Sequence, residues 1–213
     1  MKQGKISVAT VGVALIGVLL CGVGVGINSC AGLGNDSVGI LYDGIRSFLG
    51  LTAEQLGMAS NIVNIALLTL LMFIGRRYVS IGTFVYLLPY GLCVNIGNWI
   101  YNLLAVSETL PVRMIFAVLG CLLLCMGVAL FITADIGVDP FTGIVLVLVD
   151  KLKKEYRFVK IGFDISLIII GYLLGGKAGA VTLITAVCVG PCIQFFHQRF
   201  VKLLVKKDQE ENK

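Results

Sequence analysis

Long apolar stretches separated by short polar segments run through nearly the whole chain. A helix needs about 20 apolar residues to cross the roughly 30 Å hydrocarbon core of a bilayer. Stretches of about that length lie near residues 6–28, 56–75, 79–104, 111–133, 158–175 and 178–200. The pattern predicts an all-α, polytopic transmembrane protein with six spans.

Composition agrees with this interpretation, since 58% of the residues are hydrophobic and 14% are charged. Soluble domains contain about 25% charged residues, so a soluble core is excluded. The net charge of +5 arises from basic residues that flank the apolar stretches. Basic residues in that position are typical of cytoplasmic loops, so we expect the lipid bilayer as partner and no nucleic acid.

The N-terminal region resembles a signal peptide, because Lys2 and Lys5 precede an apolar run and Cys30 follows it. Signal-peptide cores are about 7 to 15 residues long, whereas this run extends from Ile6 to Ile27. We therefore expect a first helix that is retained.

Residues 22–97 recur, with few identities, at residues 125–196. The offset is 103 in the first part and shrinks to 100 and then 99, as short loop deletions would produce. This recurrence predicts two three-helix membrane repeats, residues 1–105 and 106–201, followed by a charged cytoplasmic tail, residues 202–213. The matching residues at offset 103 are Gly24, Val25, Ala31, Leu33, Gly34 and Asp36 with Gly127, Val128, Ala134, Ile136, Gly137 and Asp139.

Each repeat contains one segment that is too short to span comfortably, residues 35–49 and 138–150. About 14 helical residues reach only ~21 Å, and the first segment carries Asp43 and Arg46. We expect short broken or re-entrant helices, six crossings and inverted repeats. Both termini are then cytoplasmic, with 14 of the 17 basic residues on that side. If both short segments crossed the membrane, the chain would have eight crossings and the same number of basic residues on each side. The short length of the segments therefore favours six crossings.

Asp36 and Asp139 occupy equivalent positions at the starts of these short helices. Aspartate is a favoured N-cap residue because its carboxylate accepts from free backbone N–H groups. Broken helices at membrane depth must be buried in protein or line a wet cavity. The two carboxylates therefore either cap alone or both cap and line a solute cavity.

Other polar residues inside the spans also match between the repeats: Asn64 with Asp164, Asn95 with Gln194, and Asn98 with His197. Such residues must avoid lipid, either through interhelical hydrogen bonds or along a polar pathway. Lys160, one turn before Asp164, could neutralise it. His197 could instead couple a proton, although a histidine near a helix end more often faces the interface.

No catalytic motif, phosphate-binding loop or metal-spaced histidine cluster occurs in the sequence. The seven cysteines include two pairs at i,i+4 spacing, residues 121 and 125 and residues 188 and 192. These pairs could form a thiolate metal site, but small apolar packing residues are the better interpretation. We expect no enzyme activity, no cofactor and no metal.

Three segments carry a resemblance to a known group: GLGNDS at 32–37, DIGVDPFTG at 135–143 and VGPCIQFF at 189–196. The chain resembles the YczE/YitT group of bacterial integral membrane proteins, and the YczE side more closely. The resemblance rests on a G-x-x-P-type turn after a glycine-rich helix and a later G-P in the last helix. The first copy departs from it, with Ser37 where Pro140 stands. The resemblance implies location in the bacterial cell membrane and a presumed role in transport.

Together these features predict a small-solute transporter or permease-like protein with a cavity between the repeats. The candidate solute-binding residues are Asp36, Asp139, Asn64, Asp164, Asn95, Asn98, Gln194 and His197. The alternative is a non-transporting scaffold or regulator that assists another membrane or secretion system. The sequence leaves the solute and the oligomeric state open.

Overall fold

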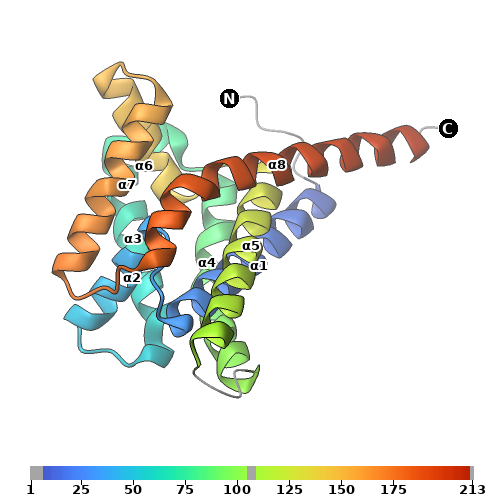
Figure 1. Ribbon diagram of the computed structural model, residues 1–213. Helices are drawn as coiled ribbons and strands as arrows, with labels where there is room; N and C mark the ends of the chain where they lie inside the picture. Colours follow the sequence, from blue (N-terminus) through green and yellow to red (C-terminus); the bar gives the residue numbers. More distant parts are fainter. Residues whose placement is uncertain (1–6, 105–108, 212–213) are drawn as a thin grey trace.

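The computed structural model describes residues 7–104 and 109–211, with side chains up to residue 202, and these ranges are helical throughout without a strand (Figure 1). The described helices are α1 (Val8–Ala31), α2 (Ser37–Phe48), α3 (Leu56–Ile74), α4 (Ile81–Leu104), α5 (Leu110–Ala134), α6 (Pro140–Leu152), α7 (Tyr156–Leu173) and α8 (Ala180–Glu211). Two 3-10 turns, η1 (Ala53–Gln55) and η2 (Arg76–Tyr78), precede α3 and α4. The all-α prediction is confirmed.

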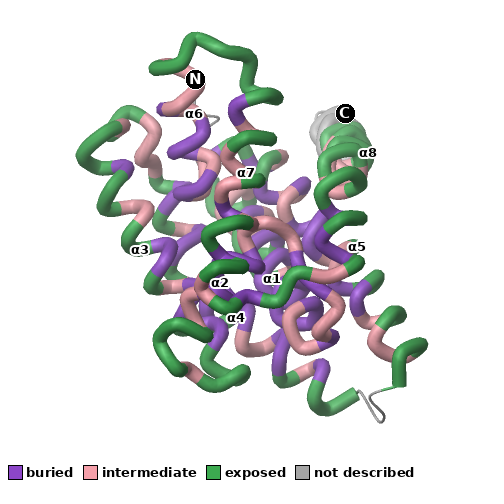
Figure 2. Tube along the Cα trace, turned by 60° about the vertical axis from the view of Figure 1, so that its left-hand side comes forward, coloured by how far each residue is buried: buried purple, intermediate pink, exposed green. Residues whose placement is uncertain are grey.

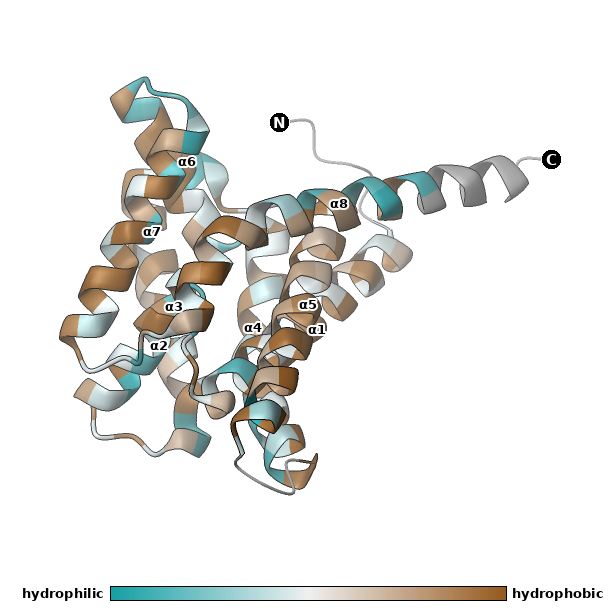
Figure 3. Ribbon diagram, viewed as in Figure 1, coloured by the Kyte–Doolittle hydropathy of each residue, from teal (hydrophilic) through white to brown (hydrophobic). Residues whose placement is uncertain are grey.

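Four helical segments are long and apolar enough to cross a membrane: Val8–Ala31, Ala53–Ile74, Leu110–Ala134 and Ala180–Lys202. They coincide with four of the six predicted spans. The other two predictions fall on α4, which contains Pro89 and several asparagines, and on α7, whose first half carries Arg157, Lys160 and Asp164. Figure 3 shows hydrophobic residues along the helices and hydrophilic residues at the α6–α7 connection.

α1 packs against both α4 and α5 (Figure 1). A Cβ atom added to Gly24 would meet the backbone of Gly120, and one added to Gly17 would meet the backbone of Gly127. The absence of side chains at these positions lets α1 and α5 meet backbone to backbone, as in close crossings of membrane helices. Figure 2 shows the buried residues gathered on the central helices.

α1 and α5 end in the same way. Gly32 follows α1 with φ +64°, and Asp135 follows α5 with φ +47°, so both helices stop at a left-handed residue. Gly34 (φ +103°) and Gly137 (φ +140°) then turn the chain into the short helices α2 and α6. Glycine adopts these backbone angles at little cost because it has no Cβ atom.

The short helices have 12 and 13 residues, and neither is among the four candidate spans. α2 packs against α7 and α3, and α6 packs against α3 and α7. Gly44 of α2 lies directly on the backbone of Gly171 in α7. The two short helices therefore both pack against the same two helices, α3 and α7.

Three basic residues lie at the end of the molecule where α1 stops. Arg113 donates to the carbonyl oxygens of Ala31 (2.6 Å) and Gly32 (2.9 Å) at the C-terminal end of α1. Arg46 and Lys177 lie at this same end, around Asp43. The start of α1, the end of α8 and the α6–α7 connection lie at the opposite end (Figure 1).

Candidate functional site

The two short helices are each capped by the predicted aspartate. Oδ1 of Asp36 accepts from the N–H of Gly39 at 3.2 Å. Oδ1 of Asp139 accepts from the N–H of Thr142 at 3.0 Å, and its Oδ2 accepts from the Thr142 hydroxyl at 2.6 Å. The capping prediction is confirmed, while contact with a solute stays a prediction.

Each turn is also held by the start of a long helix from the other half of the chain. The N–H of Val181, in α8, donates to the Leu33 carbonyl at 3.0 Å. The N–H of Gly82, in α4, donates to the Ile136 carbonyl at 3.1 Å. These bonds satisfy carbonyl groups that lipid could not satisfy. They also fix the two turns relative to both halves.

Five aromatic rings from α2, α4, α5 and α6 form a cluster, which we call the aromatic cluster. Tyr42 contacts the rings of Tyr90 and Phe141, each at a centroid distance of 5.8 Å. Tyr86 stacks on Tyr90 at 4.8 Å and meets Phe131 edge-on at 5.3 Å. Tyr42 is fully buried. The cluster is closed to solvent in this conformation.

The two capping aspartates converge on this cluster. Phe141 is the second residue after Asp139, and its ring is part of the cluster. Asp36 and Asp139 both lie close enough to Tyr42 to interact electrostatically with its hydroxyl group. Both also act on the thiol of Cys21, which is buried in the same core of side chains. The two carboxylates that the sequence pairs by repeat therefore both lie within electrostatic range of one buried tyrosine.

Asn64 lies beside Tyr42 with no exposed surface. Its Nδ2 donates to the Tyr42 hydroxyl and to the Ser60 carbonyl, both at 2.9 Å. Within the described residues its Oδ1 has no hydrogen-bond partner. A buried amide oxygen without a donor costs about 1 to 3 kcal/mol, which makes this atom a candidate acceptor.

Asp164 connects the first turn to α7. Its carboxylate accepts from the Ser37 hydroxyl at 2.8 Å and from Nζ of Lys160 at 2.6 Å. Ser37 directly follows the capping Asp36. The predicted neutralisation of Asp164 by Lys160 is confirmed, and the pair also positions the start of α2.

The side chains of Asn95 and Asn98 bind α4 to η1 and to the first turn of α3. Oδ1 of Asn95 accepts from the N–H of Gly57 at 2.9 Å. Nδ2 of Asn98 donates to the Ala53 carbonyl at 3.0 Å, and its Oδ1 accepts from the Cys30 thiol at 3.4 Å. Interhelical hydrogen bonding, one of the two alternatives for the polar residues inside the spans, accounts for both side chains.

Gln194 and His197 lie on α8. Gln194 is exposed. Nδ1 of His197 and the hydroxyl of Thr133 form a hydrogen bond of 2.9 Å that ties α8 to α5. Among the described side chains, neither has a hydrogen bond or ring contact with the aromatic cluster. Their predicted role in solute binding therefore gains no geometric support.

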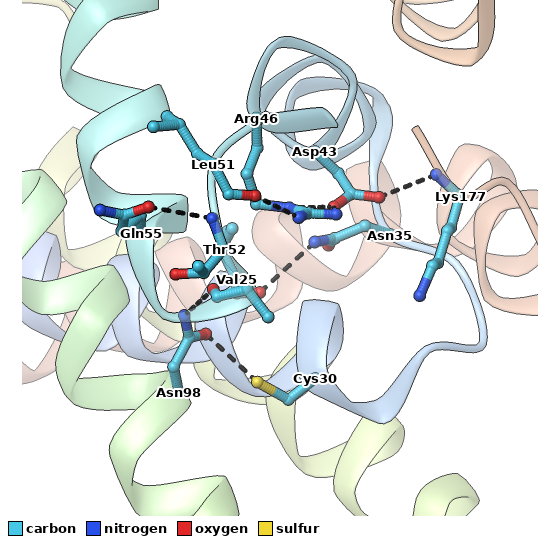
Figure 4. A network of polar contacts seen from close by, with 11 residues as sticks. Val25, Cys30, Asn35, Asp43, Arg46, Leu51, Thr52, Gln55, Asn98 and Lys177 are labelled. Atoms are coloured by element: carbon cyan, nitrogen blue, oxygen red, sulfur yellow. Dashed lines mark hydrogen bonds and ion pairs between the residues drawn. The ribbon is translucent and has the colours of Figure 1, made fainter. Parts of the chain in front are cut away.

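A second polar network surrounds the end of α2 (Figure 4). Asp43 pairs with Arg46 at 2.8 Å and accepts from the backbone N–H of Lys177 at 2.9 Å. Arg46 also donates to the Leu51 carbonyl at 2.9 Å. These bonds pair the charges of Asp43 and Arg46, which disfavour a membrane span over residues 35–49. The network anchors α2 to the α7–α8 connection.

The aromatic cluster was not predicted from the sequence, although part of its pattern is visible there. Tyr86 and Tyr90 stand four residues apart and share one face of a predicted span. Tyrosines of membrane helices concentrate at the two interfaces, so two inside one span indicate a buried polar environment. Tyr42 and Phe141 come from the two short segments, and nothing local connects them to α4.

Comparison with known proteins gives relatives without an assigned activity. A family described as a family of unknown function (DUF6198) matches residues 8–198. An uncharacterized protein of Haemophilus influenzae is 28% identical over 187 residues, which cover 88% of this chain and 83% of that protein.

The uncharacterized membrane protein YczE of Bacillus subtilis is 24% identical over 129 residues. The match covers 61% of this chain and 59% of YczE, so the chain spans less than two thirds of that relative. No solved structure matches the chain. The predicted resemblance to uncharacterized membrane proteins is confirmed, while the closer similarity to YczE has only weak support at this identity and coverage.

Proposed function

We propose that this chain, which belongs to the DUF6198 family of unknown function, is a small-solute transporter of the bacterial cytoplasmic membrane, without catalytic activity or a cofactor. In this proposal two inverted three-helix repeats enclose the solute site. The short helices α2 and α6 are re-entrant, and the solute binds at the aromatic cluster between their N-terminal ends. The observation that carries the proposal is the convergence of both broken-helix turns on one buried cluster.

The inverted arrangement is supported by contacts that occur in pairs. An offset of about 100 residues converts one member of each pair into the other, as a two-fold relation between the halves would require. Transporters with inverted repeats place the solute at the repeat interface, beside broken helices. The pairs are Gly24–Gly120 with Gly17–Gly127, and Val181–Leu33 with Gly82–Ile136.

The chemistry of the site favours a small organic cation. Aromatic faces attract cations through their negative quadrupole, and Asp36 and Asp139 add negative charge. Asn64 Oδ1 lacks a donor within the described chain, and an ammonium N–H would supply one. The basic side chain near the first turn, Lys160, is already paired with Asp164.

The test is ligand-dependent stability of the detergent-purified protein. The library contains primary amines and quaternary ammonium compounds, with neutral and anionic metabolites as comparison. A ligand at a hundred times its Kd stabilises the folded state by about 2.7 kcal/mol. We expect an organic cation to raise the melting temperature. We expect Asp36→Asn to abolish this rise while the protein stays folded, because asparagine also caps helices well.

Asp135→Asn is the matched control, since Asp135 is exposed and asparagine tolerates its left-handed backbone. It should leave the response to the cation unchanged. An identical response in Asp36→Asn would remove this residue from the site. Silence across the library, together with poor folding of Asp36→Asn and Asp139→Asn, would favour the scaffold or regulator instead. Uptake of the hit into proteoliposomes would then separate binding from transport.

A further inference from the structure

A hollow of about 360 Å³ opens between the end of α3, η2 and the end of α6. It is separate from the aromatic cluster and from the network around Asp43. Its lining combines three basic side chains, Arg76, Arg77 and Lys151, with one carboxylate, Asp150. The hollow therefore carries a net positive charge and favours an anionic ligand.

The charges within the hollow are not equivalent. The carboxylate of Asp150 accepts hydrogen bonds from the guanidinium of Arg77 and the hydroxyl of Tyr78. The charges of Asp150 and Arg77 therefore compensate each other. Arg76 and Lys151 are exposed. Neither forms an ion pair with any side chain of the described ranges. Two positive charges remain for a ligand, one from each half of the chain.

The rim of the hollow is apolar. Phe73 is 84% exposed and Ile74 is 39% exposed, and both lie at the end of α3. The segment Ala53–Ile74 is one of the candidate membrane spans, so its exposed apolar side chains face hydrocarbon. η2 follows directly, at the depth where lipid headgroups lie. The hollow thus opens at the boundary between headgroups and acyl chains.

We propose that this hollow binds the headgroup of an anionic phospholipid. Arg76 and Lys151 contact the lipid phosphate, and an acyl chain lies along Phe73 and Ile74. Arginine recognises phosphate through paired N–H groups, and basic pockets between membrane helices bind anionic headgroups. The apolar rim favours a lipid over free phosphate. A bound lipid would join the two halves at this end.

The test is native mass spectrometry of the full chain with phosphatidylglycerol, phosphatidylcholine or inorganic phosphate. We expect wild-type protein to retain one phosphatidylglycerol and the double variant Arg76→Gln/Lys151→Gln to retain at least fivefold less. The control Lys154→Gln/Arg157→Gln removes the same charge from exposed positions on the same end of the molecule. It should retain the lipid as wild type does.

Equal loss in both double variants would overturn the proposal, because it would indicate attraction to overall charge. Equal retention of phosphatidylcholine, or displacement of the lipid by inorganic phosphate, would overturn it as well. Melting temperatures without added lipid show whether each variant folds. Retention of the lipid by a well-folded Arg76→Gln/Lys151→Gln variant would exclude this hollow as the binding site.

Discussion

The turn before α2 and the turn before α6 are built alike but secured differently. Both contain a glycine at positive φ and an aspartate cap. After the first turn Ser37 donates to Asp164 on α7. After the second turn the corresponding position is Pro140, which has no hydroxyl, and Thr142 instead donates twice to Asp139.

This difference shows that similar turns can depend on different parts of the fold. The first turn takes part of its stability from the Lys160–Asp164 pair of a neighbouring helix. The second turn is stabilised by proline, which presets φ at the first helical position, and by α4, whose Thr83 hydroxyl donates to the Val138 carbonyl at 2.8 Å. A displacement of α7 would therefore act on the first turn through Asp164, whereas among the described residues no side-chain hydrogen bond joins the second turn to α7.

The largest expected effect comes from adding a methyl group at the turn glycines. Gly34→Ala and Gly137→Ala both force alanine into positive φ. At Gly34 the new Cβ also meets the backbone of Gly179, whereas at Gly137 its closest contacts are the hydroxyl and Cβ of Ser80. Left-handed strain costs about 1–2 kcal/mol and overpacking about 1–3. We expect Gly34→Ala to cost ~2–5 kcal/mol and Gly137→Ala less, measured by denaturant unfolding in detergent micelles. Equal losses would contradict this ranking.

Removing the caps should have an intermediate effect. Loss of an N-cap aspartate costs about 0.5–2 kcal/mol. We expect Asp139→Ala near the upper end, because two bonds from Thr142 are lost, and Asp36→Ala near the lower end. Unfolding free energies of both variants, with Asp135→Asn as exposed control, measure the difference. A larger loss for Asp36 would show that the first turn is the more strongly stabilised.

The smallest effect tests the link to α7. Ser37→Ala removes one hydrogen bond to a charged carboxylate that keeps Lys160 as partner, so we expect a loss on the order of 1 kcal/mol. Ser47→Ala, at an exposed position of the same helix, should change stability by less than about 0.5 kcal/mol. If Ser37→Ala costs no more than this control, α7 does not stabilise the first turn.

Local features of the site could be predicted from the sequence because their chemistry is local. The caps at Asp36 and Asp139 need only the residues that follow them. The Lys160–Asp164 pair follows from i,i+4 spacing on one helix. The short lengths of α2 and α6 likewise follow from where glycine and proline stand.

Features that depend on packing could not be predicted in this way. Periodicity places Asn95 and Asn98 on one helix face but does not say that the start of α3 lies opposite. Tyr42, Tyr90 and Phe141 belong to three helices, and their contact exists only in the assembled fold. The orphan oxygen of Asn64 is likewise a property of its surroundings.

The close packing of α1 against α5 has a consequence for biogenesis. α1 is synthesised first, yet Gly17 and Gly24 pack against Gly120 and Gly127 of α5. About a hundred residues separate the ends of the two helices, which corresponds to ~5–20 s of synthesis at about 5 to 20 residues per second. During that interval this glycine face has lipid or the insertion machinery as its neighbour. Release of a chain that ends after α4 would leave the face uncovered.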